Sequence, residues 1–375
     1  MLGEFSHKKY LCEPTQFNLS KMVDLEKITI SKTQKSRISE VDFENIPFGK
    51  VYSDHMFLAD FKNNQWGNFR VIPYGYMPIS PATPAIHYGQ SIFEGLKAYR
   101  NDKNEALVFR PLANWKRMNV SAERMCMPHI PEELFMEGMN TLLALDRDWI
   151  PTSTGSSLYI RPFMFAADEY IGIRPSDNFT FMIITCPVGS YYSTPVKVRI
   201  ETHYTRAVEG GTGFAKAGGN YAGALYPAKL AQQEGYHQLI WTDGKEHKYV
   251  EESGTMNVMF VIDDVLVTPA LGDSILRGIT RDSVLTLAKH WGMKVEERRV
   301  SVAELVDGLK SGRVKEAFGA GTAATIAHIE LIGNEGEDYF LPPIPERKFS
   351  NRVLKELDEM KRGLAPDTFD WIFKI

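Results

Sequence analysis

Runs rich in apolar residues predict several strands in the first half of the chain. Residues 51–61 and 68–74 flank the turn-rich sequence KNNQWG, residues 62–67, which predicts a β-hairpin. Residues 156–168 and 178–189 are rich in β-branched and aromatic residues, and the second run is apolar enough for a strand buried on both faces. These runs predict a sheet.

Apolar residues at helical spacing predict two helices between these strands, over residues 111–125 and 131–149. The first begins at a proline, which is favoured in the first turn of a helix. The expected buried faces comprise Leu112, Trp115 and Met118 in the first helix, and Leu134, Phe135, Met139 and Leu142 in the second.

The second half of the chain mixes shorter strands and helices. We expect strands at 196–204 and 237–243, a hairpin over 258–269 that turns at Asp263 and Asp264, and helices at 224–236, 280–292 and 353–363. Gly235 and Gly292 stand where helices commonly end, and the sequence SVAE, residues 301–304, has the spacing of a capping box.

Length and element order predict two domains. A chain of 375 residues is long for one core, and hairpins mixed with helices indicate a mixed α/β (α+β) fold rather than a doubly wound sheet. The turn-rich sequence GSYYSTP is the expected linker. The division we expect is an N-terminal arm, a smaller α/β domain, an interdomain loop and a larger domain, at residues 1–40, 41–187, 188–195 and 196–375.

Composition narrows the choice of partners. A net charge of −4 without a basic block argues against nucleic acid, and 43% hydrophobic residues are ordinary for a globular protein. Cys12, Cys126 and Cys186 are widely spaced, which indicates neither a disulfide framework nor a zinc site. The N-terminus lacks a signal-peptide core and no apolar run is long enough to span a membrane. We therefore expect a soluble cytoplasmic protein with small-molecule partners.

A single lysine, Lys216, lies in the run of small residues GGTGFAKAGGNYAGA, residues 210–224. The run is compatible with a phosphate-binding loop, an ordinary surface loop, or a lysine presented to a carbonyl. The phosphate-loop pattern fails because Ala215 and Ala217 flank the lysine, where that pattern has Gly and then Ser or Thr. GAGTAA, residues 319–324, fits a degenerate dinucleotide pattern but precedes the strand-like TIAHIEL instead of a helix.

Taken singly, Lys216, Arg117, Glu252 and the small-residue turns fit ordinary structural or surface roles. Together they supply what a pyridoxal phosphate enzyme gathers in one cleft. The cofactor's aldehyde needs a lysine amine, its ring nitrogen needs an anion, and its phosphate needs an arginine with N–H donors.

Five motifs carry a specific resemblance. FEGLKAYR, GGTGFAKAGGNYA, EESGTMN, ILRGITRDS and FGAGTAATI, in that order, resemble the class IV aminotransferases, and most closely the branched-chain amino acid aminotransferases. The resemblance runs from about Phe48 to Ile326. It implies that family's fold, with a smaller N-terminal and a larger C-terminal domain, pyridoxal 5'-phosphate at the domain interface, and a homodimer.

The resemblance also implies site residues. Lys216 matches the catalytic lysine that forms the Schiff base, and Glu252 matches the carboxylate on the pyridine nitrogen, although adjacent Glu251 leaves the register open by one residue. The other matches to cofactor contacts are Arg117, Arg206, Tyr221, Ile279, Thr280 and Thr322. The matches to substrate contacts are Phe48, Tyr88, Tyr159, Arg161, Ile173, Tyr191, Thr255 and Ala323, with Arg161 where the family uses arginine for a dicarboxylate partner.

The implied reaction is a ping-pong transfer of an amino group between leucine, isoleucine or valine and 2-oxoglutarate. The alternatives are a D-amino acid aminotransferase or an aminodeoxychorismate lyase of the same fold, and more distantly a nonenzymatic nucleotide-binding protein. Mammalian members of the family carry a CxxC redox pair where this chain has Ala324 and Ala327, so thiol control is not expected here.

Overall fold

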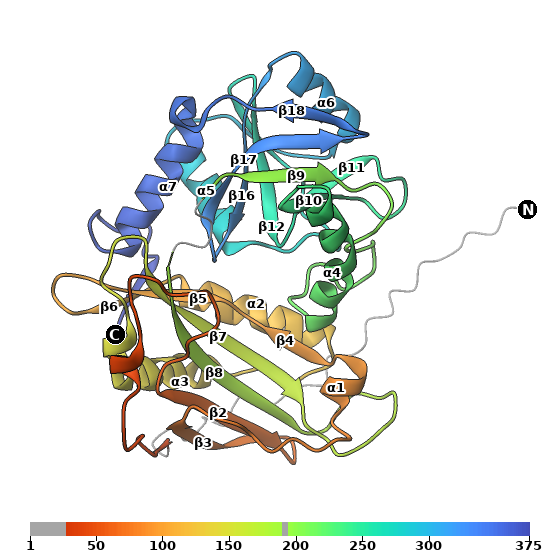
Figure 1. Cartoon of the computed structure of the whole chain (residues 1–375). Helices are drawn as coiled ribbons and strands as arrows, with labels where there is room; N and C mark the ends of the chain where they lie inside the picture. The colour runs from red at the N-terminus through yellow and green to blue at the C-terminus, as the bar shows by residue number, and fades with distance from the viewer. Residues whose placement is uncertain (1–27, 190–193) are drawn as a thin grey trace, which may run out of the picture.

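The chain forms two lobes that pack against each other (Figure 1). The computed structural model describes residues 28–189 and 194–375, so Cys12 and Tyr191 lie outside the described residues. None of the helices in these two ranges combines the length and the apolar character that crossing a membrane requires.

The first lobe is built on a nine-stranded sheet with the order β1-β3-β2-β8-β7-β5-β6-β19, with β4 paired to β7. Its strands are β1 (Thr29–Ile30), β2 (His55–Lys62), β3 (Gln65–Pro73), β4 (Ser91–Phe93), β5 (Leu96–Arg100), β6 (Ala106–Phe109), β7 (Ser157–Ala166), β8 (Phe179–Val188) and β19 (Ile372–Lys374). The predicted hairpin is confirmed as β2 and β3, which turn at Asn63 and Asn64 in the left-handed conformation that asparagine tolerates.

Helices α1 (Pro84–Tyr88), α2 (Pro111–Arg124) and α3 (Glu132–Leu145) belong to this lobe. The two predicted helices are confirmed as α2 and α3, but the expected buried face of α2 is wrong at Leu112, which is 41% exposed. Polar Asn114 and Ser121 are buried on α2 together with Met118. The spacing of apolar residues does not locate the buried face of α2, because part of that face points toward polar groups of the cavity described below.

The second lobe holds a ten-stranded sheet with the order β14-β13-β12-β16-β17-β9-β10-β11-β15, with β18 paired to β17. Because β11 also pairs with β12, the strands from β12 through β16, β17, β9 and β10 to β11 close into a ring. The strands are β9 (Val196–Ile200), β10 (Gln238–Thr242), β11 (Tyr249–Ser253), β12 (Met256–Ile262), β13 (Val265–Thr268), β14 (Val295–Glu297), β15 (Val300–Ser301), β16 (Val314–Gly321), β17 (Thr325–Asn334) and β18 (Glu337–Phe340).

Four helices accompany this sheet: α4 (Gly218–Gln233), α5 (Ile279–His290), α6 (Val302–Lys310) and α7 (Lys348–Lys361). The predicted capping box is confirmed in one half: Glu304 N–H donates to Ser301 Oγ over 3.0 Å, whereas the Glu304 carboxylate accepts from Arg298. The predicted turn at Asp263 and Asp264 is confirmed, with φ values of 48° and 62°. Gly292, which the sequence predicted to end this helix, lies just after α5 in the left-handed conformation, with φ of 74°.

Two helix starts differ from the predicted ones. Helix α4 begins at Gly218 instead of residue 224, because the contacts of the lysine loop hold a first turn that glycine would not favour by itself. Helix α7 begins at Lys348, five residues before the predicted start at Val353. TIAHIEL is a strand, as expected: it lies in β17, antiparallel to β16. GAGTAA therefore forms the end of β16 and the turn into β17, and no helix follows it as a dinucleotide site would require.

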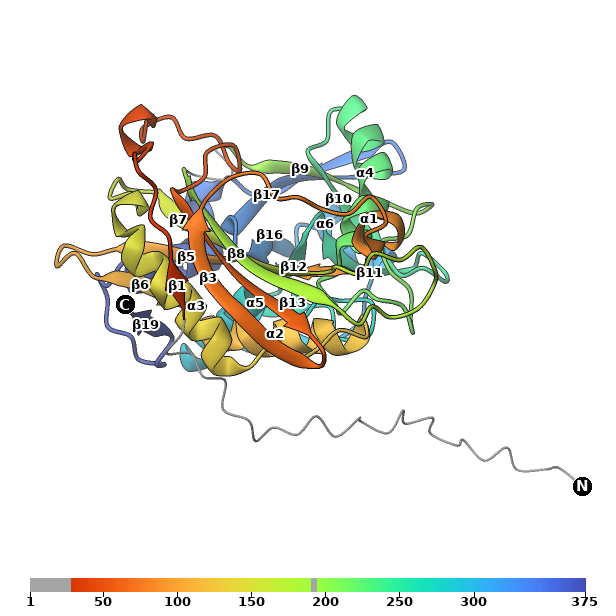
Figure 2. The ribbon, with the colours of Figure 1, turned by 90° about the horizontal axis from the view of Figure 1, so that it is seen from below.

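The lobes share an apolar cluster that fixes their relative position. Phe109 of β6 and Trp371 beside β19 pack with residues of α5, α7, β16 and β17. Strand β19 pairs with β6, so the end of the chain returns to the first sheet. The sequence had assigned all residues from 196 onward to the second domain. Figure 2 shows the first lobe in front of the second, with the strands of its sheet toward the viewer.

We predict that Met118→Ala destabilises the fold by about 2–5 kcal/mol, because it leaves a cavity at a fully buried position of α2. Leu112→Ala, on the same helix, should cost no more than about 0.5 kcal/mol because its side chain is exposed. Thermal unfolding of the two variants checks this. Equal shifts in the unfolding midpoint would contradict the assignment of the buried face.

Candidate active site

A cavity of about 370 Å³ lies between the two lobes. Twelve of the predicted site residues line it: Phe48, Arg117, Tyr159, Arg161, Lys216, Tyr221, Glu252, Thr255, Ile279, Thr280, Thr322 and Ala323. The first four come from the first lobe and the others from the second, so closure of the lobes assembles the site.

The backbone of Lys216 is hydrogen-bonded to the first lobe on both of its polar groups. Its N–H donates to Ser121 Oγ of α2 over 2.9 Å, and its carbonyl accepts from the N–H of Phe93 over 3.1 Å. Asn220 braces the preceding loop by donating to the carbonyls of Thr212 and Ala215, each over 2.8 Å. These contacts give the glycine-rich loop the support that its own small residues lack.

The amine of Lys216 points at aromatic groups of the cavity. Its Nζ donates to the Tyr221 hydroxyl over 2.8 Å and lies 4.7 Å from the centre of the Phe93 ring. Tyr221 packs on Phe93 with ring centres 4.8 Å apart. The amine therefore has a fixed partner that can accept a hydrogen bond without being a carboxylate.

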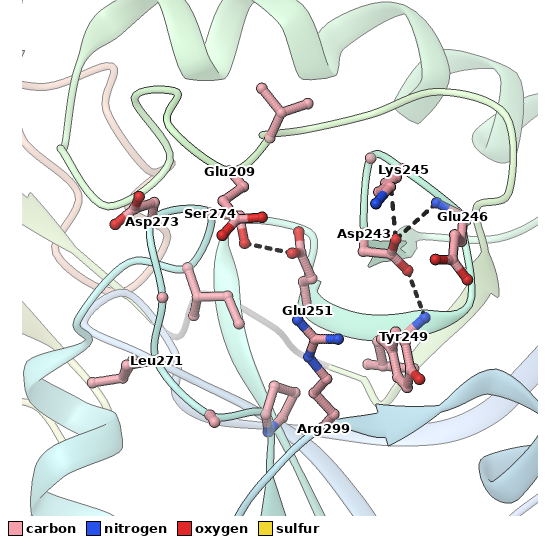
Figure 3. Close-up of a pocket in the computed structure, with 17 residues that line it drawn as sticks. Glu209, Asp243, Lys245, Glu246, Tyr249, Glu251, Leu271, Asp273, Ser274 and Arg299 are labelled. Atoms are coloured by element: carbon pink, nitrogen blue, oxygen red, sulfur yellow. Dashed lines mark hydrogen bonds between the residues drawn. The ribbon is translucent and has the colours of Figure 1, made fainter. Parts of the chain in front are cut away.

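Glu252 and Glu251 point into different cavities because successive strand residues face opposite sides of a sheet. Glu252 lines the cavity of Lys216, whereas Glu251 lines a separate pocket of about 510 Å³ and accepts a hydrogen bond from Ser274 (Figure 3). Of the two carboxylates that the sequence left open, only Glu252 shares a cavity with the lysine.

The Glu252 carboxylate is buried with incomplete charge compensation. Burial raises its pKa, while Arg206, whose Nε lies 3.4 Å from Oε2, and Lys216 oppose that shift. The N–H of Leu276 donates to Oε1 over 2.6 Å. Arg206 does not line the cavity and acts on it through Glu252. A cationic group in the cavity would stabilise this carboxylate further.

Arg117 brings a positive charge to the part of the cavity beside Arg277, whose carbonyl accepts from its Nη1 over 3.1 Å. It forms a two-pronged pair with Glu94, with Nε to Oε1 at 2.7 Å and Nη2 to Oε2 at 2.8 Å. Asn114 also donates to Glu94 over 2.8 Å. Burial acts against ionisation of Glu94, but Arg117 and Lys216 outweigh it and lower the pKa of this carboxyl.

Helix α5 begins two residues after Arg277, and its first turn lines the cavity. Gly278 precedes the helix, and a Cβ at this position would lie 1.9 Å from Asn257 Oδ1, so only glycine fits. Ile279 and Thr280 follow and line the cavity. Free N–H groups of a helix N-terminus, together with Arg117, form a setting for a phosphate dianion.

The residues present fit pyridoxal 5'-phosphate. The cavity has an amine at Lys216, an under-compensated buried carboxylate at Glu252, and a helix N-terminus beside Arg117. These groups line one cavity, and their chemistry matches the aldehyde, the ring nitrogen and the phosphate of that cofactor.

The remaining wall is aromatic with one cation. The Arg161 guanidinium lies over the rings of Phe93 and Tyr159, 4.6 and 5.3 Å from their centres, and Nη2 donates to the Tyr159 hydroxyl over 3.1 Å. Its buried Nε has no hydrogen-bond partner within the described part of the chain. Phe48 packs edge-on against Tyr159 with ring centres 5.3 Å apart. An apolar side chain or a carboxylate could occupy this space.

Comparison with known proteins places the chain in a family. The model of the amino-transferase class IV family matches residues 91–332. The chain belongs to the class IV aminotransferases. Its relatives include branched-chain-amino-acid aminotransferase 2 of Bacillus subtilis, 42% identical over 83% of this chain and 86% of that protein, and the branched-chain-amino-acid aminotransferase of Mycolicibacterium smegmatis, 40% identical over 83% and 86%.

Solved structures of the class IV aminotransferases have the same fold. The branched-chain amino acid aminotransferase from Escherichia coli superposes with a TM-score of 0.68 at 25% identity, covering 85% of this chain and 98% of that one. The branched-chain enzyme of T.th., in a structure with pyridoxamine 5'-phosphate, gives a TM-score of 0.71 at 25% identity, covering 86% and 99%. The two-domain class IV fold expected from the motifs is confirmed.

Two of the predicted substrate contacts among the described residues lie away from the class IV site. Tyr88 and Ile173 are 44% and 94% exposed and do not line the cavity of the single chain. They lie on α1 and on the loop between β7 and β8. Tyr191 lies outside the described residues.

Sequence reasoning overlooked residues that position this class IV site. Glu94 lies within the FEGLKAYR motif, but it was assigned no role from the sequence. A carboxylate between two apolar strands indicates a buried charge that needs a partner. Ser121 follows Arg117 by four residues, which puts the two on one face of α2. Cys186 packs behind Tyr159, and burial raises the pKa of its thiol to about 11 against the effect of Arg161.

We predict that Glu94→Gln destabilises the protein by about 3–5 kcal/mol at pH 7, because it leaves Arg117 buried without its counter-ion. The pKa of Glu94 is lower in the folded state than the ordinary value of about 4.3. The carboxylate therefore stabilises the fold above about pH 4.3, and this contribution is lost as the pH falls through the folded-state pKa.

Unfolding curves of the native protein and Glu94→Gln between pH 7 and pH 3.5 check this. The difference in the free energy of unfolding between the two proteins should become smaller as the pH falls. Glu123→Gln, an exposed residue of α2, is the matched control and should leave stability unchanged at both pH values. A constant difference across the range would show that the charge of Glu94 contributes nothing.

Proposed function

We propose that this chain is a branched-chain amino acid aminotransferase that moves the amino group between leucine, isoleucine or valine and 2-oxoglutarate with pyridoxal 5'-phosphate as cofactor. One observation carries the substrate class: a single arginine, Arg161, stands in an aromatic wall beside the amine of Lys216. The names of relatives 40–42% identical over 83% of the chain support the same activity.

The cofactor, when bound, supplies an aldehyde for the amino group and a ring that takes up negative charge. Arg117 and the first turn of α5 would hold its phosphate, and Glu252 would keep a proton on its ring nitrogen. Burial of Glu252 suits that role, because a buried carboxylate gains most from a cationic partner.

Lys216 is the proton carrier at the substrate's Cα. With cofactor and substrate bound, Lys216 Nζ would take the proton from the substrate's Cα as general base and would later give it up as general acid. Tyr221 orients the amine through its hydroxyl, and the hydrogen bonds to Ser121 and Phe93 keep the lysine backbone in place. Positioning of this kind raises the effective concentration of the amine at the reacting carbon.

The same space can bind an apolar or a carboxylate side chain. Branched aliphatic groups would pack on Phe48 and Tyr159, whereas the side-chain carboxylate of glutamate would pair with Arg161, whose buried Nε has no other partner among the described residues. Thr255, Thr322 and Ala323 also line the cavity, and the α-carboxylate shared by all substrates would bind to them. Burying the second carboxylate without Arg161 would be costly.

A homodimer in the cytoplasm is the assembly and location that we propose. Support for the dimer comes from apolar side chains that are exposed on α1 and on the loop between β7 and β8: Ile86, Tyr88, Tyr170, Ile171 and Ile173. A second copy that covers them would bring Tyr88 and Ile173 into a buried setting. The localisation rests on the sequence alone.

An activity screen tests the function. The cofactor-loaded protein should convert L-leucine, L-isoleucine and L-valine with 2-oxoglutarate to glutamate, and should leave D-alanine and aminodeoxychorismate unchanged. Conversion of a D-amino acid or of aminodeoxychorismate without conversion of the branched-chain substrates would favour the rival activities.

We predict that Arg161→Ala slows the glutamate half-reaction by about 100-fold or more, the effect of losing about 3 kcal/mol from a desolvated charge pair. The leucine half-reaction should change much less, because leucine makes no ion pair there. Single-turnover measurements of cofactor absorbance with each substrate alone separate the two.

Arg313→Ala, a partly exposed arginine after α6, is the control and should leave both half-reactions unchanged. Equal losses in both halves for Arg161→Ala would mean that Arg161 binds the α-carboxylate, and the two carboxylate positions would be exchanged.

A further inference from the structure

The turn between β16 and β17 forms the substrate side of the cavity and has an unfavourable backbone. Gly321, Thr322 and Ala323 line the cavity, and Thr325 ends the turn with φ of 62°. A β-branched residue in this left-handed region costs on the order of 1–2 kcal/mol. The turn therefore needs contacts from outside to keep its shape.

Two lysines that the reaction does not use contact this turn from behind. Lys97 of β5 donates from Nζ to the carbonyl of Ala323 over 2.5 Å, and Lys361 of α7 donates from Nζ to Thr325 Oγ1 over 2.9 Å. Lys97 belongs to the first sheet, directly opposite Tyr159, and α7 packs on β16 and β17. The two lobes thus hold neighbouring atoms of one turn.

The surroundings of these amines are unusual for lysine. Lys361 is 4% exposed, and among the described residues neither amine lies within 4.0 Å of a carboxylate. The Lys361 amine lies 4.9 Å from the centre of the Phe109 ring. Asp358 and Arg362 of α7 are the other charged groups near the pair, and Arg362 lies over the Tyr99 ring.

Burial is the main cause of the low basicity of both amines. It lowers the pKa of Lys97 to about 8, with Arg362 adding to the effect, and the pKa of Lys361 to about 7, with Lys97 adding to it. Burying two amines in this way costs free energy. We therefore expect the hydrogen bonds that they make to serve a purpose.

We propose that Lys97 and Lys361 are positioning residues that hold the Thr322–Thr325 turn in the shape that binds the substrate's α-carboxylate. Lys97 fixes the Ala323 carbonyl, which orients the peptide group that follows it, and Lys361 fixes the side chain of Thr325 in its left-handed conformation. The inference rests on the proposed function, which places the α-carboxylate at this turn.

The test measures binding of 4-methylvalerate, a leucine analogue without the amino group, by calorimetry on the cofactor-loaded protein. Lys97→Met and Lys361→Met should each bind it at least 10-fold more weakly and raise the KM for leucine, while cofactor absorbance and retention stay native. Lys361→Gln, which keeps an N–H donor, should recover part of the affinity. Adding Thr325→Gly to Lys361→Met should also recover affinity, because glycine adopts the left-handed conformation without strain.

Lys355→Met is the matched control on the exposed face of α7 and should bind the analogue as the native protein does. Affinities within twofold of native for Lys97→Met and Lys361→Met would overturn the proposal and leave the lysines a structural role, even where their melting temperatures fall. Failure of the native protein itself to bind 4-methylvalerate while retaining cofactor on Lys216 would count against the proposed function instead.

Discussion

The hydrogen bonds that join the backbone of Lys216 to the first lobe are the constraint on which the site depends. Lys216 belongs to the second half of the chain, yet its N–H and its carbonyl are both bonded to the first lobe, through Ser121 and Phe93. A run of small residues has little stiffness of its own. The position of the amine is therefore a property of the closed pair of lobes, and any change that separates the lobes moves the reacting group.

Charge is distributed around this lysine in a way that serves binding more than stability. Arg117 is paired with Glu94, whereas Glu252 remains under-compensated by Arg206 at 3.4 Å, and Arg161 keeps a buried donor without a partner in the described part of the chain. Unsatisfied buried groups normally destabilise a fold, so they are expected where a ligand supplies the missing partner. The incompletely paired charges of Glu252 and Arg161 lie where we propose that the cofactor ring and the substrate bind, and the Arg117–Glu94 pair keeps the arginine in place for the proposed phosphate contact.

Much of this could be predicted from local sequence, and the remainder depends on contacts between distant segments. The helix cap at Ser301 and the turn at Asp263 were predictable because their chemistry is local. The early start of α4 was not, because its glycines are poor helix formers and are held by contacts of the loop before them. Strand β19 was missed because a strand of three residues has too little pattern to detect. Motifs placed Lys216 and Glu252 in one cavity, but Glu94 and Lys361 act through neighbours that are far away in sequence.

The most direct test of the account is the site of cofactor attachment. Protein loaded with pyridoxal 5'-phosphate is reduced with borohydride, digested and mapped by mass spectrometry, with Lys216→Arg as the matched control. The account predicts a reduced pyridoxyl group on Lys216 of the native protein and no label at that position in the variant, with no label on the buried Lys97 or Lys361. A label on any other lysine of the native protein, with Lys216 unmodified, would contradict it.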